Sequence, residues 1–281
     1  MNEVKSINKE FIITNDFNIH NITITEDTTL NVVVKKGVKT KLIEVLNISN
    51  NNNMINIEYN LTLEEESKLD LVTIYCGDNA NINLCTKVLE KAYLNSMKLA
   101  SFDGNINVLG NTYLRYRAHN DEYNVFINSN KHKQDFSYNV YHEEKESESN
   151  MKNYAICKNE SILNVNTNGL VLRGAKESVL NQKSKGILLS KESAISANPL
   201  LQIDEYDCLA SHGAGIGAID EEDLFYLMSR GLTRSESEKL IIKGFINPIQ
   251  ENLKQFENVA DKANEIKEIN NLFNELINKY L

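Results

Sequence analysis

The residues best suited to chemistry lie in one short segment, where a thiol and an imidazole are four positions apart. Cys208 precedes His212, and Gly213, Gly215 and Gly217 follow it. A neutral imidazole binds metal ions or moves protons, and a thiolate binds iron or accepts sulfur. The glycines leave the backbone around the imidazole uncrowded. The segment therefore predicts a metal or sulfur site, with His212 as the first candidate ligand and Cys208 as the second.

A structural interpretation of the same segment remains open. The glycines would then let the chain turn from strand to helix, while His212 caps a carbonyl and Cys208 points into a β-core. One thiol and one imidazole also fall short of the four ligands that an iron–sulfur cluster usually has. Any cluster would need further ligands from another chain or from small thiols. We therefore expect no metal group that this chain binds tightly by itself.

Familiar catalytic motifs are missing from the sequence. It contains no G-x-x-x-x-G-K-[ST] phosphate loop, no G-x-G-x-x-G fingerprint, no H-E-x-x-H pair and no G-x-S-x-G elbow. The acidic pair Asp204/Glu205 is interpreted as a turn, and Glu221/Glu222 as a helix start. A β-rich chain with paired carboxylates could also be a carbohydrate-active enzyme, and this stays a remote alternative. We predict that the protein is not an enzyme.

Composition and charge exclude several partners. The chain has 281 residues and a net charge of -9, and a nucleic-acid partner would need a concentrated basic surface. No apolar stretch reaches the roughly 20 residues of a membrane helix, and the first residues contain no signal-peptide core. The four cysteines lack C-x-x-C spacing, which argues against a zinc site or a disulfide framework. We expect a cytoplasmic protein that binds neither nucleic acid nor membrane.

Alternating apolar and polar residues fill the chain from about residue 10 to residue 205. The runs are separated by Asn, Gly, Asp or Ser and recur every 8–12 residues or so, which is typical of a β-sandwich, barrel or solenoid. Hairpin signals are weak, and asparagines are expected in short polar corners, so the pattern modestly favours a β-helix. No repeat of constant length is visible. A sandwich remains open at this point.

The last quarter of the chain predicts three helices. Asp220 is a candidate N-cap for a helix that ends at Gly231. A capping box, Thr233 with Glu236, begins a second helix that ends near Gly244. Pro248 then begins a third helix of about thirty residues. Its apolar stripe consists of Ile249, Leu253, Phe256, Val259, Ala263, Ile266, Leu272 or Phe273, Leu276 and Tyr280. We divide the chain into a β-domain, 1–217, and a helical domain, 218–281.

Residues 181–245 resemble the SufB/SufD family of iron–sulfur cluster assembly scaffold proteins. Four blocks carry the likeness, and a weaker likeness extends back to His142. The blocks are Gln182 with Ile187-Leu188-Leu189-Ser190, Pro199-Leu200-Leu201-Gln202-Ile203, Ser211-His212-Gly213-Ala214 with Gly217, and Ile219-Asp220-Glu221-Glu222 continuing from Leu224 to Gly231, followed by Gly244-Phe245. The last two blocks together are specific to the family.

The resemblance implies a fold and partners. The fold is a right-handed parallel β-helix followed by a C-terminal helical domain. The partners are a SufC-like ABC ATPase docked on those helices, a second SufB/SufD-type subunit or a second copy of this chain, and, indirectly, a cysteine desulfurase system. A transient iron–sulfur cluster would be built at the dimer interface, with His212 on the family's functional histidine. The expected ATPase-binding residues are Leu224, Phe225, Tyr226, Met228, Arg230, Gly231 and Phe245.

Two features refine the resemblance. His212-Gly213-Ala214 is SufD-like, and Lys183 and Ser184 stand after Gln182 where SufB-like members have a sulfur-accepting cysteine. The chain also resembles compact members that lack an N-terminal helical domain. We therefore expect a scaffold subunit that binds the ATPase and helps to build or transfer clusters. The alternative is a regulatory or structural partner of the ATPase that binds no cluster.

Overall fold

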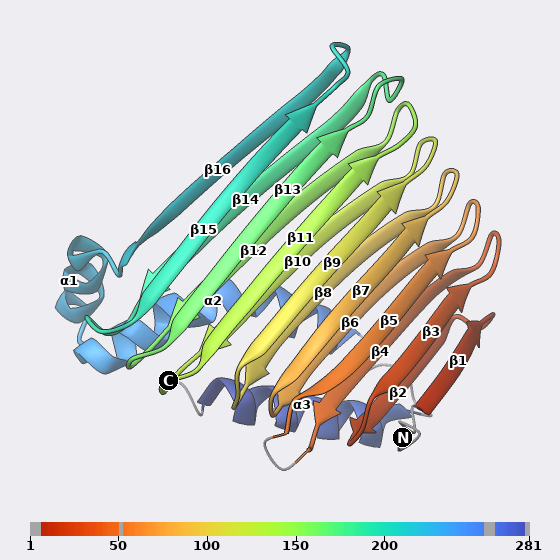
Figure 1. The fold of residues 1–281 in the computed structure, drawn as a ribbon. Coiled ribbons are helices and arrows are strands. Elements are labelled where there is room, and N and C mark those ends of the chain that lie inside the picture. Colours follow the sequence, from red (N-terminus) through yellow and green to blue (C-terminus); the bar gives the residue numbers. More distant parts are fainter. Residues whose placement is uncertain (1–6, 51–52, 256–261, 279–281) are drawn as a thin grey trace.

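The computed structural model describes residues 7–50, 53–255 and 262–278, and it consists of a long β-body followed by helices (Figure 1). The described strands are β1 Ile7–Ile13, β2 Phe17–Ile24, β3 Thr28–Val34, β4 Lys39–Ile48, β5 Ile55–Leu63, β6 Lys68–Gly77, β7 Ala80–Val88, β8 Tyr93–Phe102, β9 Ile106–Leu114, β10 His119–Asn128, β11 Lys133–His142, β12 Glu148–Cys157, β13 Ile162–Val171, β14 Ser178–Leu188, β15 Ala194–Ile203 and β16 Cys208–Ala218. The helices are α1 Glu221–Ser229, α2 Arg234–Gln255 and α3 Ala263–Asn278.

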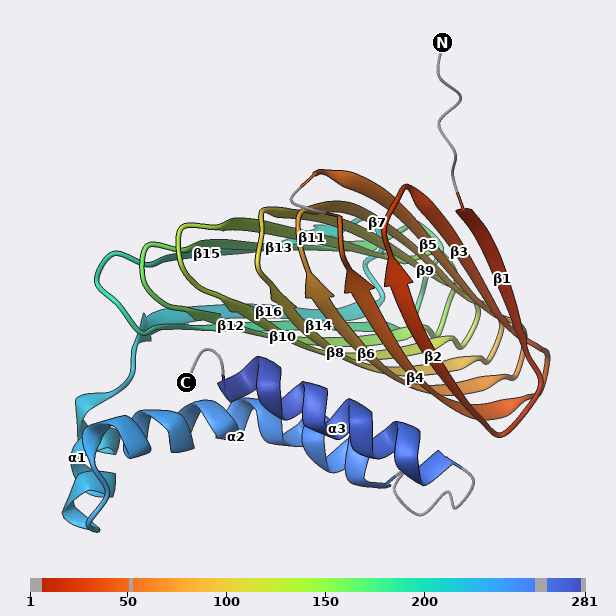
Figure 2. The same cartoon turned by 90° about the horizontal axis from the view of Figure 1, so that it is seen from below.

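The strands form two parallel sheets that face each other (Figure 2). One contains the odd-numbered strands in the order β1-β3-β5-β7-β9-β11-β13-β15, and we call it the odd sheet. The other, the even sheet, runs in the order β16-β14-β12-β10-β8-β6-β4-β2. The chain thus adds one strand to each sheet in every coil. The predicted parallel β-helix with a helical C-terminal part is confirmed, and the sandwich is excluded.

Coil length varies along the solenoid. Partners in register are 21 residues apart between Ile7 and Thr28, and 32 apart between Ile162 and Ala194. Consequently, residues that stack on one another in space occur at irregular spacing in the sequence. This variation explains why no constant repeat is visible in the sequence.

One row of corners has the same backbone conformation in successive coils. Glu66, Lys91, Arg117, Glu146 and Glu177 have φ values between 52° and 59°. Each of their backbone N–H groups donates to a carbonyl in the next coil. The left-handed conformation is costly for a residue with a side chain, so these hydrogen bonds help to maintain it. The corners therefore link each coil to the next.

Asparagines also stack along the strands, and not in the corners alone. Asn60 donates to Asn31, which donates to Asn8, at 2.9 and 3.0 Å. A second ladder joins Asn181 to Asn150 at 3.0 Å. Asn31 and Asn60 are register partners, as are Asn150 and Asn181, and amides on neighbouring coils can satisfy one another because each carries both a donor and an acceptor. The abundance of asparagine thus reflects coil stacking as well as turn formation.

The central part of the even sheet is buried on both of its faces. Its inner face packs against the odd sheet, and α2 and α3 pack against its outer face (Figure 2). Every residue from Asn124 to Asn128 in β10 is therefore buried. The cluster between this sheet and the helices includes Ile43, Val45, Val72, Ile74, Leu99, Val125, Ile127, Ile156, Ile242, Ile246, Ile249, Leu253, Ile266, Ile269, Phe273 and Ile277.

The predicted boundary between the second and third helices is wrong. α2 continues from Arg234 to Gln255 through Gly244, with Pro248 inside the helix. A proline and a glycine inside a helix cost about 4 kcal/mol together. Burying four large aliphatic side chains of α2 (Ile242, Ile246, Ile249 and Leu253) contributes roughly 6–12 kcal/mol, so packing outweighs local propensity.

The predicted thirty-residue helix is also wrong, because its stripe is divided between α2 and α3. These two helices lie side by side on the even sheet, and Gln250 Nε2 donates to Asn274 Oδ1 at 3.3 Å (Figure 2). Phe256, Val259 and Tyr280 of the predicted stripe lie outside the described residues. Among the described helices, none is both long and apolar enough to cross a bilayer.

A buried histidine stabilises the corner before β12. His142 is fully buried, with Nδ1 2.8 Å from Ser147 Oγ and Nε2 2.8 Å from Ser149 Oγ. Ser147 Oγ in turn donates to the Glu144 carbonyl at 3.0 Å. Burial lowers the pKa of His142 to about 4, because the imidazolium form would lose its hydration.

We expect acid to destabilise the fold through His142. The unfolded imidazole titrates near pH 6.5 and the folded one near 4, so below about pH 6.5 the unfolded state binds the extra proton. The free energy of unfolding should fall by up to about 3 kcal/mol between these pH values. Urea unfolding across this range should show the loss. His142→Gln should reduce the pH dependence, whereas His132→Gln should retain it; equal slopes in both variants would contradict the assignment.

Candidate functional site

Among the described strands, none lies beyond the last coil of the solenoid. β15 and β16 are the last strands of the odd and even sheets. β16 is exposed from Leu209 to Ala218, which no earlier strand of the even sheet shows. Several large apolar side chains are exposed on this last coil, namely Leu200, Ile203, Tyr206, Leu209 and Ile216. An open edge with apolar side chains is a template for pairing with another chain.

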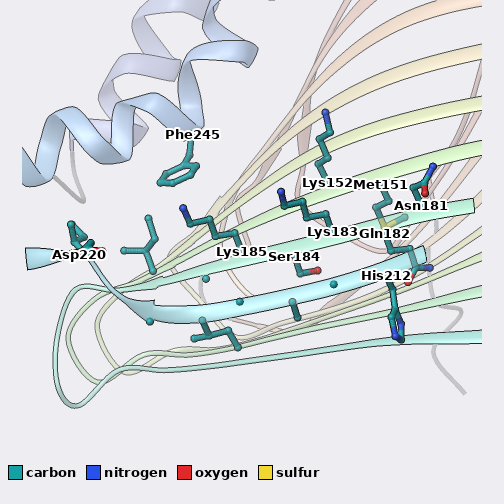
Figure 3. Close-up of a pocket in the computed structure, with 18 of the residues that line it drawn as sticks. Met151, Lys152, Asn181, Gln182, Lys183, Ser184, Lys185, His212, Asp220 and Phe245 are labelled. Atoms are coloured by element: carbon teal, nitrogen blue, oxygen red, sulfur yellow. The ribbon is translucent and has the colours of Figure 1, made fainter. Parts of the chain in front are cut away.

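A cavity of about 890 Å³ adjoins this edge. It is lined by β12, β14 and β16, by residues at the start of α1, and by Ile241 and Phe245 in the middle of α2. Figure 3 shows that Lys152, Lys183 and Lys185 extend to one side of the strands, whereas His212 extends to the other. Because side chains alternate along a strand, these sides correspond to the outer and inner faces of the even sheet.

His212 lies on the inner face of β16 and is exposed. Its register partner on β14 is Gln182. No hydrogen bond joins the imidazole to another group in the described parts of the chain, so it does not cap a carbonyl there. The glycines do not form a turn either, because β16 continues as a strand to Ala218. His212 is therefore available to a ligand or a partner at the open end.

Cys208 is on the same face as His212 but is not close to it. Four residues along a strand span about 13 Å, so the two side chains cannot bind one metal ion together. The thiol donates to the Glu205 carbonyl at 3.2 Å. Partial burial, followed by the charges of Glu205 and Asp207, raises the pKa of Cys208. The group therefore favours the thiol over the metal-binding thiolate.

No set of three or more His, Cys, Asp or Glu side chains within the described residues could hold a metal ion. Around His212 the described residues thus offer fewer than three such side chains. A metal ion or cluster bound there would need further ligands.

Three lysines form a row on the outer face of the last coils. Lys152 and Lys183 are register partners, and Lys185 is two residues further along β14. None of the three forms an ion pair with the described residues, although Asp220 and Asp223 line the same cavity. Lys185 Nζ lies 5.0 Å from the Phe245 ring centroid. The cavity therefore has a cationic wall in a chain whose net charge is -9.

Helix α1 projects beyond the last coil (Figures 1 and 2). As predicted, Asp220 caps it by accepting from the Glu222 N–H at 2.8 Å, and Gly231 has a positive φ of 98° after its end. Phe225 is 74% exposed and Tyr226 57%. Together with Met228, 43% exposed, these residues define what we call the α1 surface.

The other predicted ATPase-binding residues do not all lie on the α1 surface. Leu224 is 1% exposed, so it packs inward and does not belong to the α1 surface. Arg230 is exposed, with its guanidinium 5.3 Å from the Tyr226 ring centroid, and Gly231 follows it. Phe245 is half-buried in α2 and packs on Tyr154 with ring centroids 5.1 Å apart. Phe245 therefore helps to hold α2 on the even sheet.

The acidic pairs have the structural roles that the sequence predicts. The Glu205 carboxylate accepts from the backbone N–H groups of Gly174 and Asp207, which makes its segment a turn. These hydrogen bonds lower the pKa of Glu205. At the start of α1, Glu221 pairs with Arg234 at 2.7 Å.

Sequence reasoning missed the lysine row and two buried polar residues of the cavity, Gln182 and Ser184. Lys183-Ser184-Lys185 does show strand alternation, which was the available signal. The position of Lys152 beside Lys183 depends on strand register, and the variable coil length hides that register. The cavity could therefore not be assembled from spacing alone.

Comparison with protein families identifies one match that covers most of the chain. Residues 19–245 match the family model described as the SufBD core domain of SUF system FeS cluster assembly. This interval includes most of the solenoid, all of α1 and the first half of α2. It also contains His212, the lysine row and the α1 surface.

Individual relatives agree with the family match. The chain is 33% identical to the iron-sulfur cluster assembly protein SufD of Bacillus subtilis over 132 residues, which is 47% of this chain and 30% of that protein. It is 40% identical to a SufBD family protein of Pyrococcus horikoshii over 85 residues, 30% of this chain and 19% of the relative. It is 35% identical to the iron-sulfur cluster assembly protein SufD of Escherichia coli over 71 residues, which is 25% of this chain and 17% of that protein. The matches thus span less than a third of each relative.

The glycines of β16 should tolerate a methyl group. A Cβ on Gly215 would meet nothing within 4 Å, whereas one on Gly110 would lie 2.5 Å from Tyr138 Cδ1. We expect Gly215→Ala to change the free energy of unfolding by less than about 0.5 kcal/mol or to raise it slightly. Gly110→Ala should lower it by about 1–3 kcal/mol. Urea unfolding of the monomer measures both, and a large loss in Gly215→Ala would show that β16 is covered.

Proposed function

Because the chain belongs to the SufBD core-domain family of the SUF iron–sulfur cluster assembly system, we propose that it is a scaffold subunit for cluster assembly. In this role it binds a SufC-like ABC ATPase and pairs with a second SufB/SufD-type subunit or with itself. It contributes His212 to iron or a nascent cluster at the paired ends. Sulfur reaches the site indirectly from a cysteine desulfurase system, and the chain alone turns over no substrate.

The observation that carries this proposal is the position of His212 on an open strand edge. An exposed imidazole with no partner among the described residues can supply one ligand to a metal ion, and the remaining ligands must come from other groups. Strand pairing along β16 would bring a second chain's side chains within reach of it. A cluster at this edge would then have ligands from two chains, which a single chain lacks.

The open coil supports pairing with a second subunit. Its apolar side chains, including Leu209 and Ile216, are exposed in the single chain. Pairing with another last coil would satisfy the free backbone groups of β16 and bury this apolar surface. Self-pairing and pairing with a different family member use the same chemistry, so the proposal includes both.

The α1 surface supports docking of the ATPase. Two large aromatic side chains and a methionine are exposed on one short helix, and such residues dominate binding energy at protein interfaces. The helix projects from the solenoid, so a partner can reach it without displacing the core (Figure 1). α1 also follows β16 directly in the chain. Movement of an ATPase docked on α1 would therefore be passed to β16, the strand at the open edge.

Family membership removes the support for a carbohydrate-active enzyme. The regulatory alternative remains, in which the chain binds the ATPase but no cluster. The properties of Cys208 do not distinguish the scaffold from the regulator. In the proposed scaffold the ligands besides His212 come from a second chain, so neither the raised pKa of Cys208 nor its distance from His212 affects the site. Cluster formation therefore distinguishes the scaffold from the regulator.

Loss of the α1 surface should weaken ATPase binding. We expect Phe225→Ala to reduce the affinity for the cognate ATPase by about tenfold or more, as for an aromatic side chain central to an interface. Isothermal titration or pull-down with the full chain measures this change. Leu109→Ala removes an exposed apolar side chain from β9 on the odd sheet, away from α1, and should bind normally. Absent binding by the unaltered chain would refute the docking proposal.

Loss of the imidazole should reduce cluster formation. Anaerobic reconstitution with the ATPase and the second subunit should yield fewer clusters per complex in His212→Ala than in the unaltered protein. The visible absorbance and the iron and sulfide content measure the yield. His132→Ala changes a histidine in the corner before β11 and should leave it unchanged. An unaltered yield in His212→Ala, with complex formation intact, would favour the regulatory role.

A further inference from the structure

The interior of the solenoid contains a small cavity with a polar lining. It has a volume of about 20 Å³, counted as the space that the centre of a water molecule can reach. The inner faces of β5 and β7 line it from the odd sheet, and those of β6 and β8 from the even sheet. This cavity shares no lining residue with the one beside His212. Its polar lining residues are Tyr59, Thr73, Tyr75, Thr86, Ser96 and Lys98.

Tyr75 presents a buried phenol to this cavity. The residue is 7% exposed, and its hydroxyl makes no hydrogen bond to the described residues. Tyr59, which lines the same cavity, shows the usual arrangement, because its hydroxyl donates to Glu44 Oε2 at 2.6 Å. Burial raises the pKa of Tyr75, so the phenol keeps its proton. A buried tyrosine normally has an acceptor for that proton, and Tyr75 has none within the described chain.

Two groups next to Tyr75 also have unused hydrogen-bond capacity. Thr73 is 1% exposed, and its hydroxyl has no partner among the described residues. Its register partner on β8 is Lys98, whose Nζ lies 2.9 Å from Glu122 Oε2. An ammonium group has three donors, and this ion pair uses one of them. Thr73, Tyr75 and Lys98 thus occupy adjacent positions on the inner face of the even sheet and share one cavity.

The volume of the cavity limits the size of its ligand. A cavity needs roughly 10–15 Å³ of such space to hold one water molecule, so about 20 Å³ accommodates one water and no larger molecule. A neighbouring cavity of about 10 Å³ shares Tyr75 and Lys98 with it and has a mainly apolar lining. That volume is at the lower limit for a water, so we assign no ligand to the smaller cavity.

The charges around the cavity favour a neutral ligand. Lys98 is the one charged residue of the described lining, and the buried Glu122 carboxylate balances its charge. An additional ion would be buried without a counter-charge, which is costly between two apolar sheets. The hydroxyls of Thr73 and Tyr75 can donate or accept, whereas the ammonium donates alone. A water molecule matches this set, because it accepts two hydrogen bonds and donates two.

We propose that this cavity is an internal hydration site, in which one water molecule is bound by Tyr75, Thr73 and Lys98. The water accepts hydrogen bonds from the Tyr75 hydroxyl and the Lys98 ammonium, and it donates one to Thr73 Oγ1. Three hydrogen bonds are typical of a buried water. The bound water supplies the phenol with an acceptor and hydrates the ammonium, so it lowers the cost of burying both groups in the solenoid core.

A crystal structure of the full chain, at a resolution that shows ordered waters, tests the site directly. Electron density for one water should lie within hydrogen-bond distance of Tyr75 Oη and Lys98 Nζ. Crystals soaked in sodium bromide should show no anomalous signal at the same position. Absence of density in the cavity would overturn the hydration site. A bromide signal there would overturn the choice of a neutral ligand.

The sign of a stability change tests the site in solution. Tyr75→Phe and Thr73→Val each remove one hydroxyl partner of the water and keep the shape of the side chain, so the urea midpoint of unfolding should fall in both. Around a dry cavity the same changes would delete a buried hydroxyl without a partner, and the midpoint would rise. Tyr141→Phe is the control, because it removes a hydroxyl from the outer face of the odd sheet, where Tyr141 is half-buried, and should leave the midpoint unchanged. A midpoint that rises or stays constant in either interior variant would overturn the proposal.

Discussion

A parallel β-helix satisfies its backbone only by stacking one coil on another, and this constraint determines where the molecule can act. Interior coils have hydrogen-bond partners on both sides, so their strands are closed to other chains. The last coil has a partner on one side alone, and β16 is consequently exposed along nearly its whole length. His212 lies on this strand. The residue that we propose to meet a second chain is thus located on the strand that has a paired neighbour on one side alone.

The even sheet connects this edge to the helices. Its inner face forms the solenoid core and its outer face forms the core beneath α2 and α3, so strands such as β10 are buried on both sides. Such a sheet transmits strain with little deformation, because both faces are close-packed. α1 is different, since it follows β16 directly and projects beyond the packed body (Figure 2). α1 is thus joined to the open strand by the short connection before it, and to α2 by the ion pair between Glu221 and Arg234.

The sequence predicts those parts of the fold that depend on residues close together in the chain. Strand alternation and the Asp220 cap belong to this kind, and the structure confirms both. The continuation of α2 through Pro248 was not predictable, because four side chains of α2 pack on a sheet remote in sequence. The site was also predictable in part: His212 stood out, but spacing alone suggested that Cys208 was its neighbour. In an extended strand that spacing becomes about 13 Å.

The remaining parts of the cavity depend on register, which no short motif encodes. Lys152 and Lys183, or Gln182 and His212, become neighbours only when coils of unequal length are stacked. The same stacking joins Asn124 to Asn153 and Asn153 to Ser184 by hydrogen bonds between neighbouring coils. The polar interior of the last coils is therefore determined by strand register, whereas the exposure of His212 is determined by its position on the last strand.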